Sequence, residues 1–161
     1  MKTDENPRFG ERYNVLEKIG QGGMGSVYKV WDTLTMATRA LKELSGRHLD
    51  SSSALLGFRN EFRVMTQFQH PNMVKVYEYA MIQENIPVII MEYVSGKNLS
   101  ELTELPAHQI TDILIRILHG LAHIHSRLYV HRDLKPANIR RMEDGRVKLL
   151  DYGLMSQIGV Q

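Results

Sequence analysis

Three kinds of polar side chain lie close together in one short stretch of this sequence. The stretch reads His131-Arg132-Asp133-Leu134-Lys135-Pro136-Ala137-Asn138, and Asp151-Tyr152-Gly153 follows further along the chain. It places a carboxylate, an ammonium group and an amide on one loop, with a second carboxylate expected one hairpin later. Such groups can hold the phosphates and the magnesium ion of a nucleoside triphosphate. The pattern therefore predicts phosphoryl transfer from ATP.

A glycine-rich segment, Gly20-Gln21-Gly22-Gly23-Met24-Gly25, fits a Gly-x-Gly-x-x-Gly pattern. Dinucleotide-binding folds and simple tight turns also use this pattern, so the segment alone decides little. A dinucleotide site needs a helix at the third glycine, whereas Ser26 to Trp31 continue as a strand. We therefore predict a hairpin flap whose backbone amides approach phosphate oxygens, with a plain hairpin turn as the alternative.

Lys42 lies on the third expected strand, residues 38–42, where its ammonium group would project back under the flap toward the phosphates. A lysine on a strand is usually solvated. Glu61 on the next expected helix favours a different arrangement, because its carboxylate could hold the ammonium group in place. We predict this ion pair, and we expect Met91-Glu92-Tyr93-Val94 at a junction of two lobes, where backbone groups can hydrogen-bond an adenine edge.

These groups need a scaffold of strands and helices. The sequence pattern predicts strands over residues 13–19, 26–31, 38–42, 74–79 and 87–93. The last of these is almost wholly apolar, which indicates a central place in its sheet. Ser51, Ser52 and Ser53 offer N-caps for a helix with apolar residues at Leu55, Phe58, Phe62 and Met65. A longer amphipathic helix is expected from Ile110 to Leu121, with a wide apolar face formed by Ile110, Ile113, Leu114, Ile117, Leu118 and Leu121.

Together, these motifs resemble the eukaryotic-type protein kinase family. The similarity runs from about Tyr13 to Leu154, and Gly22-Gly23-Met24-Gly25 is similar to the bacterial serine/threonine branch. The residues around Lys135 also resemble serine/threonine-specific kinases more than tyrosine-specific ones. The resemblance implies ATP and Mg²⁺ as cofactors, and serine or threonine hydroxyls of proteins as phosphate acceptors.

The resemblance implies an α+β, kinase-like fold. A complete N-lobe, with a five-stranded antiparallel sheet and one main helix, is expected over residues 13–91. Residues 1–12 would form an N-terminal tail, residues 92–97 a hinge, and residues 98–161 a partial, mainly helical C-lobe with the catalytic loop.

The resemblance also implies roles for single residues. Asp133 would orient and deprotonate the substrate hydroxyl, Lys135 would steady the γ-phosphate, and Lys42 paired with Glu61 would complete the catalytic set. Asn138 and Asp151 would hold magnesium. The expected nucleotide contacts are Ile19, Gly20, Gln21, Gly22, Gly23, Met24, Gly25, Val27, Ala40, Lys42, Met91, Glu92, Val94 and Asn98.

Within that set, the resemblance places Val27 and Ala40 above the adenine and Asn98 near the ribose. Met91 would be the gatekeeper, and Glu92 and Val94 would supply hinge backbone. Arg132 implies regulation by a phosphate on an activation loop. The hydrophobic column of an assembled family member would consist of Met65, Val76, His131 and Tyr152.

Three features depart from the family pattern. The sequence stops at Gln161, before most of an activation loop and the later C-lobe helices, so we expect a fragment or a truncated gene product. Arg140 and Arg141 stand where the family usually places apolar residues that form the floor under adenine. The favoured interpretation is that their stems pack and both guanidinium groups reach solvent, and the alternative is that a guanidinium group packs or stacks there. Tyr152 replaces the commoner phenylalanine and adds a hydroxyl that needs a partner.

Without later helices, the apolar face of the helix at 110–121 would be partly uncovered, which predicts self-association. A rival hypothesis is a binding module, in which a fragment or pseudokinase retains nucleotide, or a partner kinase, without turnover. His119 and His123 lie four residues apart, with His125 nearby, a spacing that could bind a metal. No carboxylate or further ligand stands at zinc-site spacing, so packed or solvated histidines are favoured.

Composition sets broad limits on function. The 161 residues are 43% hydrophobic and carry a formal net charge of only +2, with scattered Lys and Arg, so no nucleic-acid partner is expected. The absence of cysteine excludes disulfides, thiolate metal sites and a cysteine nucleophile. The longest apolar run, Pro87 to Met91, is too short to cross a bilayer, and the N-terminus is polar. We therefore predict a cytoplasmic protein without a signal peptide, and no membrane partner for this chain.

Overall fold

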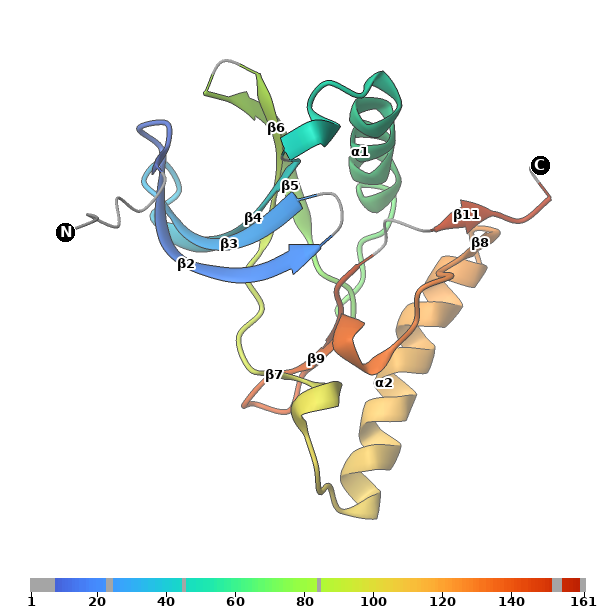
Figure 1. Ribbon diagram of the computed structural model, residues 1–161. Coiled ribbons are helices and arrows are strands. Elements are labelled where there is room, and N and C mark those ends of the chain that lie inside the picture. The colour runs from blue at the N-terminus through green and yellow to red at the C-terminus, as the bar shows by residue number, and fades with distance from the viewer. Residues whose placement is uncertain (1–7, 23–24, 45, 84, 152–154, 160–161) are drawn as a thin grey trace. The chain divides into compact units, whose positions relative to one another are not determined.

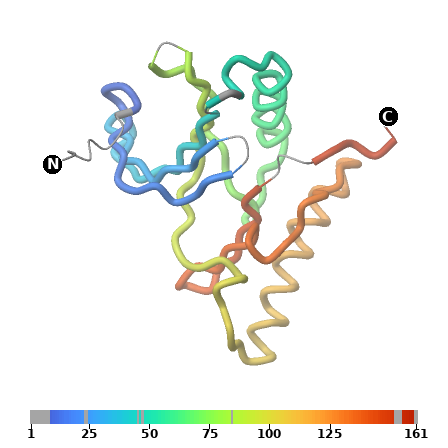
Figure 2. The backbone as a smooth tube through the Cα atoms, viewed as in Figure 1, coloured from blue at the N-terminus to red at the C-terminus, as the bar shows by residue number. Residues whose placement is uncertain are grey.

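The computed structural model of the chain describes residues 8–22, 25–44, 46–83, 85–151 and 155–159. These residues form two compact units. Unit 1 consists of the described residues up to Phe62 together with Val76–Tyr93, and unit 2 of Arg63–Lys75 together with the described residues from Val94 onward. Each unit is therefore built from segments that are separated along the chain, as the trace in Figure 2 allows the reader to follow.

Unit 1 is an antiparallel sheet accompanied by one helix (Figure 1). Its strands lie in the order β1-β2-β3-β4-β6-β5, which confirms the predicted five-stranded antiparallel sheet and adds β1 at its edge. The apolar strand β6 lies between β4 and β5, as its sequence predicted. The elements are β1 (Arg8–Phe9), β2 (Tyr13–Gly22), β3 (Gly25–Asp32), β4 (Ala37–Leu44), η1 (Gly46–His48), α1 (Ser52–Met65), β5 (Val76–Ile82) and β6 (Ile86–Glu92).

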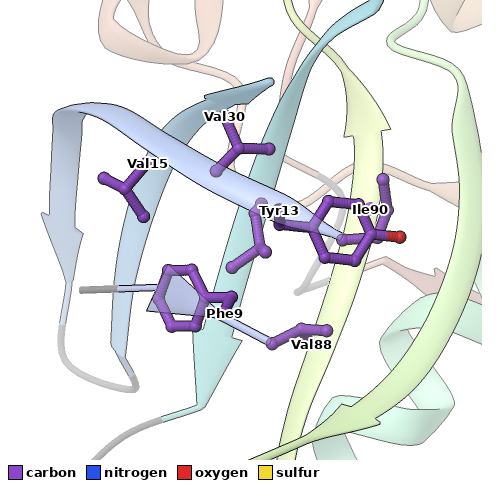
Figure 3. Close-up of a cluster of buried hydrophobic side chains, with 7 residues drawn as sticks. Phe9, Tyr13, Val15, Val30, Val88 and Ile90 are labelled. Carbon is purple, nitrogen blue, oxygen red and sulfur yellow. The ribbon is translucent and has the colours of Figure 1, made fainter. Parts of the chain in front are cut away.

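One face of this sheet carries the apolar core of unit 1 (Figure 3). The buried members of this core are Phe9, Tyr13, Val15, Val30, Leu41, Val88 and Ile90. Leu41 on β4 is paired with Ile90 on β6, so the two side chains point to the same side of the sheet. Successive side chains on a strand point to opposite faces. Burial of Leu41 therefore turns its neighbours Ala40 and Lys42 to the other face.

The segment that the sequence placed in an N-terminal tail contributes to this unit. Phe9 on β1 is 3% exposed and meets the Tyr28 ring edge to face, with 5.0 Å between ring centroids. Arg12 donates hydrogen bonds from Nε and Nη2 to the two carboxylate oxygens of Asp32, at 2.9 and 3.0 Å, and from Nη1 to Glu78 at 2.8 Å. Residues 8–12 therefore tie the edge of the sheet to β3 and β5.

The buried carboxylate of Asp32 predicts an acid-sensitive step in stability. The hydrogen bond from Arg12, with further ones from Thr35 and the Leu34 amide, lowers the pKa of Asp32 from 3.8 to about 2. Because the folded-state pKa lies below the unfolded value, this stabilisation is present above pH 4 and is lost as the pH falls toward 2. A shift of this size corresponds to about 2 kcal/mol of stability at neutral pH.

We therefore expect Asp32→Asn to lower the free energy of unfolding by about 2 kcal/mol at pH 7, and the difference from wild type to shrink between pH 4 and pH 2. Urea unfolding followed by the fluorescence of the single tryptophan, Trp31, measures this. Asp144→Asn is the matched control, because Asp144 pairs with Arg146 in the open, at 51% side-chain exposure, and its loss should leave the midpoint unchanged. A constant difference across the pH range would contradict the prediction.

Helix α1 starts as its serines predicted. The amide of Ala54 donates to Ser51 Oγ at 3.3 Å, which caps one of the amides that the first turn leaves without a helical partner. Phe58 and Phe62 lie against the ring of Tyr79 on β5, with centroid distances of 6.3 and 5.8 Å. These contacts fix the rotation of α1 about its axis, and they place Glu61 on its buried face.

Unit 2 contains one long helix, α2 (Ala107–His125), against which the short strands β8 (Tyr129–Val130) and β10 (Val147–Leu149) pack (Figure 1). Gly120 of α2 marks a close approach, since a Cβ atom there would lie 3.0 Å from Leu149 Cδ1. The backbone of Leu149 also exchanges hydrogen bonds with the loop before β5, through Asn72 O at 2.8 Å and Val74 N at 2.9 Å. The elements are β7 (Lys97–Asn98), η2 (Leu99–Glu101), α2 (Ala107–His125), β8 (Tyr129–Val130), η3 (Pro136–Asn138), β9 (Ile139–Arg141), β10 (Val147–Leu149) and β11 (Ser156–Gln157).

The apolar face of α2 is only partly covered, as its sequence predicted. Ile113, Ile117 and Ile124 are buried, whereas Ile110, Leu114, Ile115 and Leu118 are exposed. Self-association through this surface stays a prediction. Neither helix within the described ranges combines the length and the apolarity that a membrane crossing requires.

Candidate functional site

The loop between β8 and β9 carries the polar residues of the first motif. Its start is fixed because β8 pairs with β11, and its end because Pro136 opens the short helix η3, where a proline needs no amide hydrogen. Between them, Arg132 adopts a positive φ of 63°, a backbone conformation that residues other than glycine rarely adopt. This turn in the backbone stands directly before Asp133.

Asp133 is held by two of its neighbours. Lys135 Nζ lies 2.8 Å from Asp133 Oδ2, and Asn138 Nδ2 donates both to Oδ2 at 2.8 Å and to the Asp133 carbonyl at 2.9 Å. The hydrogen bond from Lys135, with that from Asn138, lowers the pKa of Asp133, and the same contact with Asp133 raises the pKa of Lys135. At neutral pH the loop therefore presents an ionised carboxylate beside a protonated amine.

His131 fixes the base of this loop. Its ring is 3% exposed, and its Nδ1 accepts a hydrogen bond from the Asp133 amide at 3.3 Å. Burial lowers the pKa of His131, although the nearby negative charges of Asp151 and Asp133 act in the opposite direction. A neutral ring with an accepting Nδ1 suits this structural role.

Asn138 and Asp151 come together through a hairpin, as the sequence predicted. Strands β9 and β10 pair in antiparallel fashion, and Gly145 in their turn has a positive φ of 84°. The amide of Leu150 then donates to the Asn138 carbonyl at 2.9 Å, which brings residue 151 next to Asn138 along the backbone. An amide oxygen and a carboxylate are ligands that Mg²⁺ accepts, so the residues present fit the predicted metal. Tyr152 and Gly153 lie outside the described residues.

In unit 1, Lys42 and Glu61 form the predicted ion pair. Lys42 Nζ lies 2.6 Å from Glu61 Oε1, and the side chain of Glu61 is only 6% exposed. Val27 on β3 stands opposite Lys42, and Met91 on β6 stands opposite Ala40. Opposed residues share a face, as do alternate residues on one strand. One face of the sheet therefore carries the lysine together with small and apolar side chains on which a flat ring can lie.

The glycine-rich segment forms the predicted hairpin between β2 and β3. Gly20 is paired with Val27, and Gly22 with Gly25. A Cβ atom at Gly25 would lie 1.8 Å from the carbonyl oxygen of Glu43, so only glycine fits where β3 meets β4. Gly23 and Met24 lie outside the described residues, and their predicted contact with phosphates stays a prediction.

The predicted hinge residues fall in both units. Met91 and Glu92 end β6 in unit 1, and Val94 and Asn98 belong to unit 2. The guanidinium group of Arg140, which the favoured interpretation placed in solvent, is partly buried and donates hydrogen bonds to the Val94 carbonyl and to Asn98 Oδ1 at 2.9 and 3.2 Å. Charge at this position was visible in the sequence, whereas its partners, more than forty residues away, were not.

Two further expectations concern groups of residues. In the predicted hydrophobic column, Met65 and His131 are buried, and Tyr152 falls outside the described part of the chain. His123 lies against the ring of His70, with 5.1 Å between centroids, and His119 and His125 stand on the same helix. Throughout the described residues, no cluster of three or more His, Cys, Asp or Glu side chains could hold a metal ion.

Residues 13–161 match the family described as protein kinase domain. A probable serine/threonine-protein kinase of Streptomyces coelicolor is 34% identical over 97% of this chain. The serine/threonine-protein kinases PrkC of Bacillus subtilis and PknL of Mycobacterium tuberculosis are 33% and 34% identical over 94% and 96% of it. The aligned part makes up 24%, 24% and 39% of these three relatives, so the chain spans well under half of their length.

Proposed function

Because this chain belongs to the protein kinase domain family, we propose that it is the ATP-binding and catalytic-loop part of a serine/threonine protein kinase. The reaction is transfer of the γ-phosphoryl group of ATP to a serine or threonine hydroxyl of a protein. The observation that carries the proposal is the network around Asp133, in which Lys135 and Asn138 both bind one carboxylate. The Lys42–Glu61 ion pair supports it independently from the other unit.

Each of these residues has a distinct task in the proposed reaction. Asp133 accepts a hydrogen bond from the attacking hydroxyl group of the substrate. This hydrogen bond points the hydroxyl oxygen at the γ-phosphorus. Because its pKa is lowered, Asp133 is a weak base, which suits orientation and a late proton transfer better than early deprotonation. Lys135 and Lys42 supply positive charge to the phosphates as negative charge develops on the transferred group.

Asn138 and Asp151 are proposed to hold magnesium together with the triphosphate. The metal ion would neutralise charge on the phosphate oxygens and fix their orientation. Asn138 contributes in a second way, because its Nδ2 already binds Asp133 while its Oδ1 remains on the other side of the same amide. One side chain thus couples the position of the metal to the position of the catalytic carboxylate.

A cytoplasmic location belongs to this proposal, since ATP and Mg²⁺ are abundant there and a cysteine-free chain needs no oxidising compartment. The exposed apolar side chains of α2 (Ile110, Leu114, Ile115 and Leu118) favour a partner or additional chain that covers them.

The experiment that tests the proposal measures binding and transfer separately. We expect Mg-ATP to raise the melting temperature of the chain, ATP with excess chelator to raise it less, and labelled phosphate to appear on a generic serine/threonine substrate. Stabilisation without transfer would favour the rival hypothesis, a binding module that retains nucleotide without turnover. If neither stabilisation nor transfer is observed, the chain has no nucleotide site and the proposal is wrong.

A further inference from the structure

The guanidinium group of Arg140 joins two parts of unit 2 that are distant in sequence. Arg140 lies on β9, opposite Asn98 on β7. Its Nη1 donates to the carbonyl of Val94 at 2.9 Å, and its Nε donates to the side-chain oxygen of Asn98 at 3.2 Å. A single planar cation therefore binds one backbone group and one side chain of the segment from Val94 to Asn98.

Other contacts show that this segment is built to lie against β9. Gly96 has a positive φ of 99°, and a Cβ atom there would lie 2.2 Å from the carbonyl oxygen of Arg141. The Asn98 amide donates to Glu101 Oε2 at 3.0 Å, which completes a capping box at the start of η2. Val94 itself is 4% exposed. Gly96 and the pairing of β7 with β9 already hold the segment from Val94 to Asn98 close to β9, and the side chain of Arg140 adds two hydrogen bonds to this contact.

We propose that Arg140 is a positioning residue for the nucleotide base, which it serves by fixing the Val94 carbonyl and the Asn98 side chain. This inference rests on the proposed function, in which Val94 supplies hinge backbone and Asn98 lies near the ribose. An apolar residue at position 140 could only pack beneath the base. The rigid fork of an arginine also sets the orientation of the two groups beside it.

The physical effect is preorganisation. Without the two hydrogen bonds, residues 94–98 sample more conformations before the base binds, and binding must then order them. Arg140→Leu should therefore weaken the affinity for adenosine and for Mg-ATP by the same factor, roughly fivefold to tenfold. The factor is equal because Arg140 acts on the base side of the site, and both ligands carry the same base.

Two variants separate this role from a general effect of charge or of folding. Arg140→Lys keeps the positive charge but lacks the two-donor fork, so it should lose nearly as much affinity as Arg140→Leu. Arg141→Leu is the matched control, because Arg141 is the next residue on β9 and its side chain points to the opposite side of the strand. It should bind both ligands as the wild type does.

The test combines calorimetric titration of adenosine and Mg-ATP with amide hydrogen exchange. In Arg140→Leu and Arg140→Lys, but not in Arg141→Leu, we expect the amides of residues 95–98 to exchange roughly ten times faster. An Arg140→Leu variant with unchanged affinities, or one that weakens Mg-ATP but not adenosine, would overturn the positioning role and leave the proposed function standing. A wild-type chain that binds neither ligand would overturn the proposed function and this role with it.

Discussion

Replacing Asp133 with asparagine should lower the rate of phosphoryl transfer by about 10³ while leaving the affinity for Mg-ATP within about twofold. Asparagine keeps the size of the side chain and an oxygen that Lys135 and Asn138 can still reach. It loses the negative charge that attracts the hydroxyl proton of the substrate. The change therefore removes an interaction made with the reacting hydroxyl and spares those made with the nucleotide.

Single-turnover transfer of labelled phosphate, with ATP binding measured on the same preparation, tests this expectation. Asp144→Asn is the control, because it removes an exposed carboxylate of the same unit whose partner, Arg146, follows it closely in the β9–β10 turn. The lowered pKa of Asp133 adds a further condition. The wild-type rate should show no acid limb from this residue above about pH 5, since the carboxylate stays ionised there. If Asp133→Asn transfers phosphate at the wild-type rate, the proposed role of Asp133 in orienting the substrate hydroxyl is wrong.

Sequence reasoning worked well where a local pattern carries the structure. The five strands of unit 1, the serine cap of α1 and the hairpin between Asn138 and Asp151 all follow from periodicity or from residues near in sequence. The Lys42–Glu61 pair was also predicted, because Glu61 shares a face of the expected helix with Phe58 and Met65, where its carboxylate could hold the ammonium group of Lys42. The structure joins them at 2.6 Å.

The same reasoning missed contacts that no local pattern encodes. Strand β1 has only two residues, too few to show an alternation, so Phe9 and Arg12 appeared to belong to a tail. Arg12 meets Glu78 across 66 positions, and Arg140 meets Val94 across 46. A long charged side chain is usually solvated, and only the folded backbone reveals which carbonyl or carboxylate lies within its reach.

The Lys42–Glu61 pair allows stability and chemistry to be separated by mutation. Lys42→Met should leave the 6% exposed carboxylate of Glu61 without its cation. A buried charge without a partner destabilises a protein, by about 3 kcal/mol in comparable cases. The same substitution should also lower the transfer rate by about 10² or more, because it removes a positive charge proposed to contact the phosphates.

Adding Glu61→Leu to Lys42→Met should restore stability but not transfer. The double variant has no unpaired buried charge at this position, and a leucine next to Phe58 can pack where the carboxylate was, so the free energy of unfolding should return to within about 1 kcal/mol of wild type. The ammonium group is still missing, and the rate should therefore remain about 10² below wild type. Urea unfolding and single-turnover transfer measure the two quantities on the same samples.

The contrast between the two readouts carries the argument. If Lys42 acted only by satisfying Glu61, the double variant would recover stability and rate together. If the ion pair contributed nothing to folding, Lys42→Met would unfold at the wild-type urea concentration. Arg146→Met supplies the control for loss of a cation, since its partner Asp144 is exposed and neither stability nor transfer should change. Recovery of stability with no recovery of transfer is the result that places the ammonium group of Lys42 at the phosphates rather than in the scaffold alone.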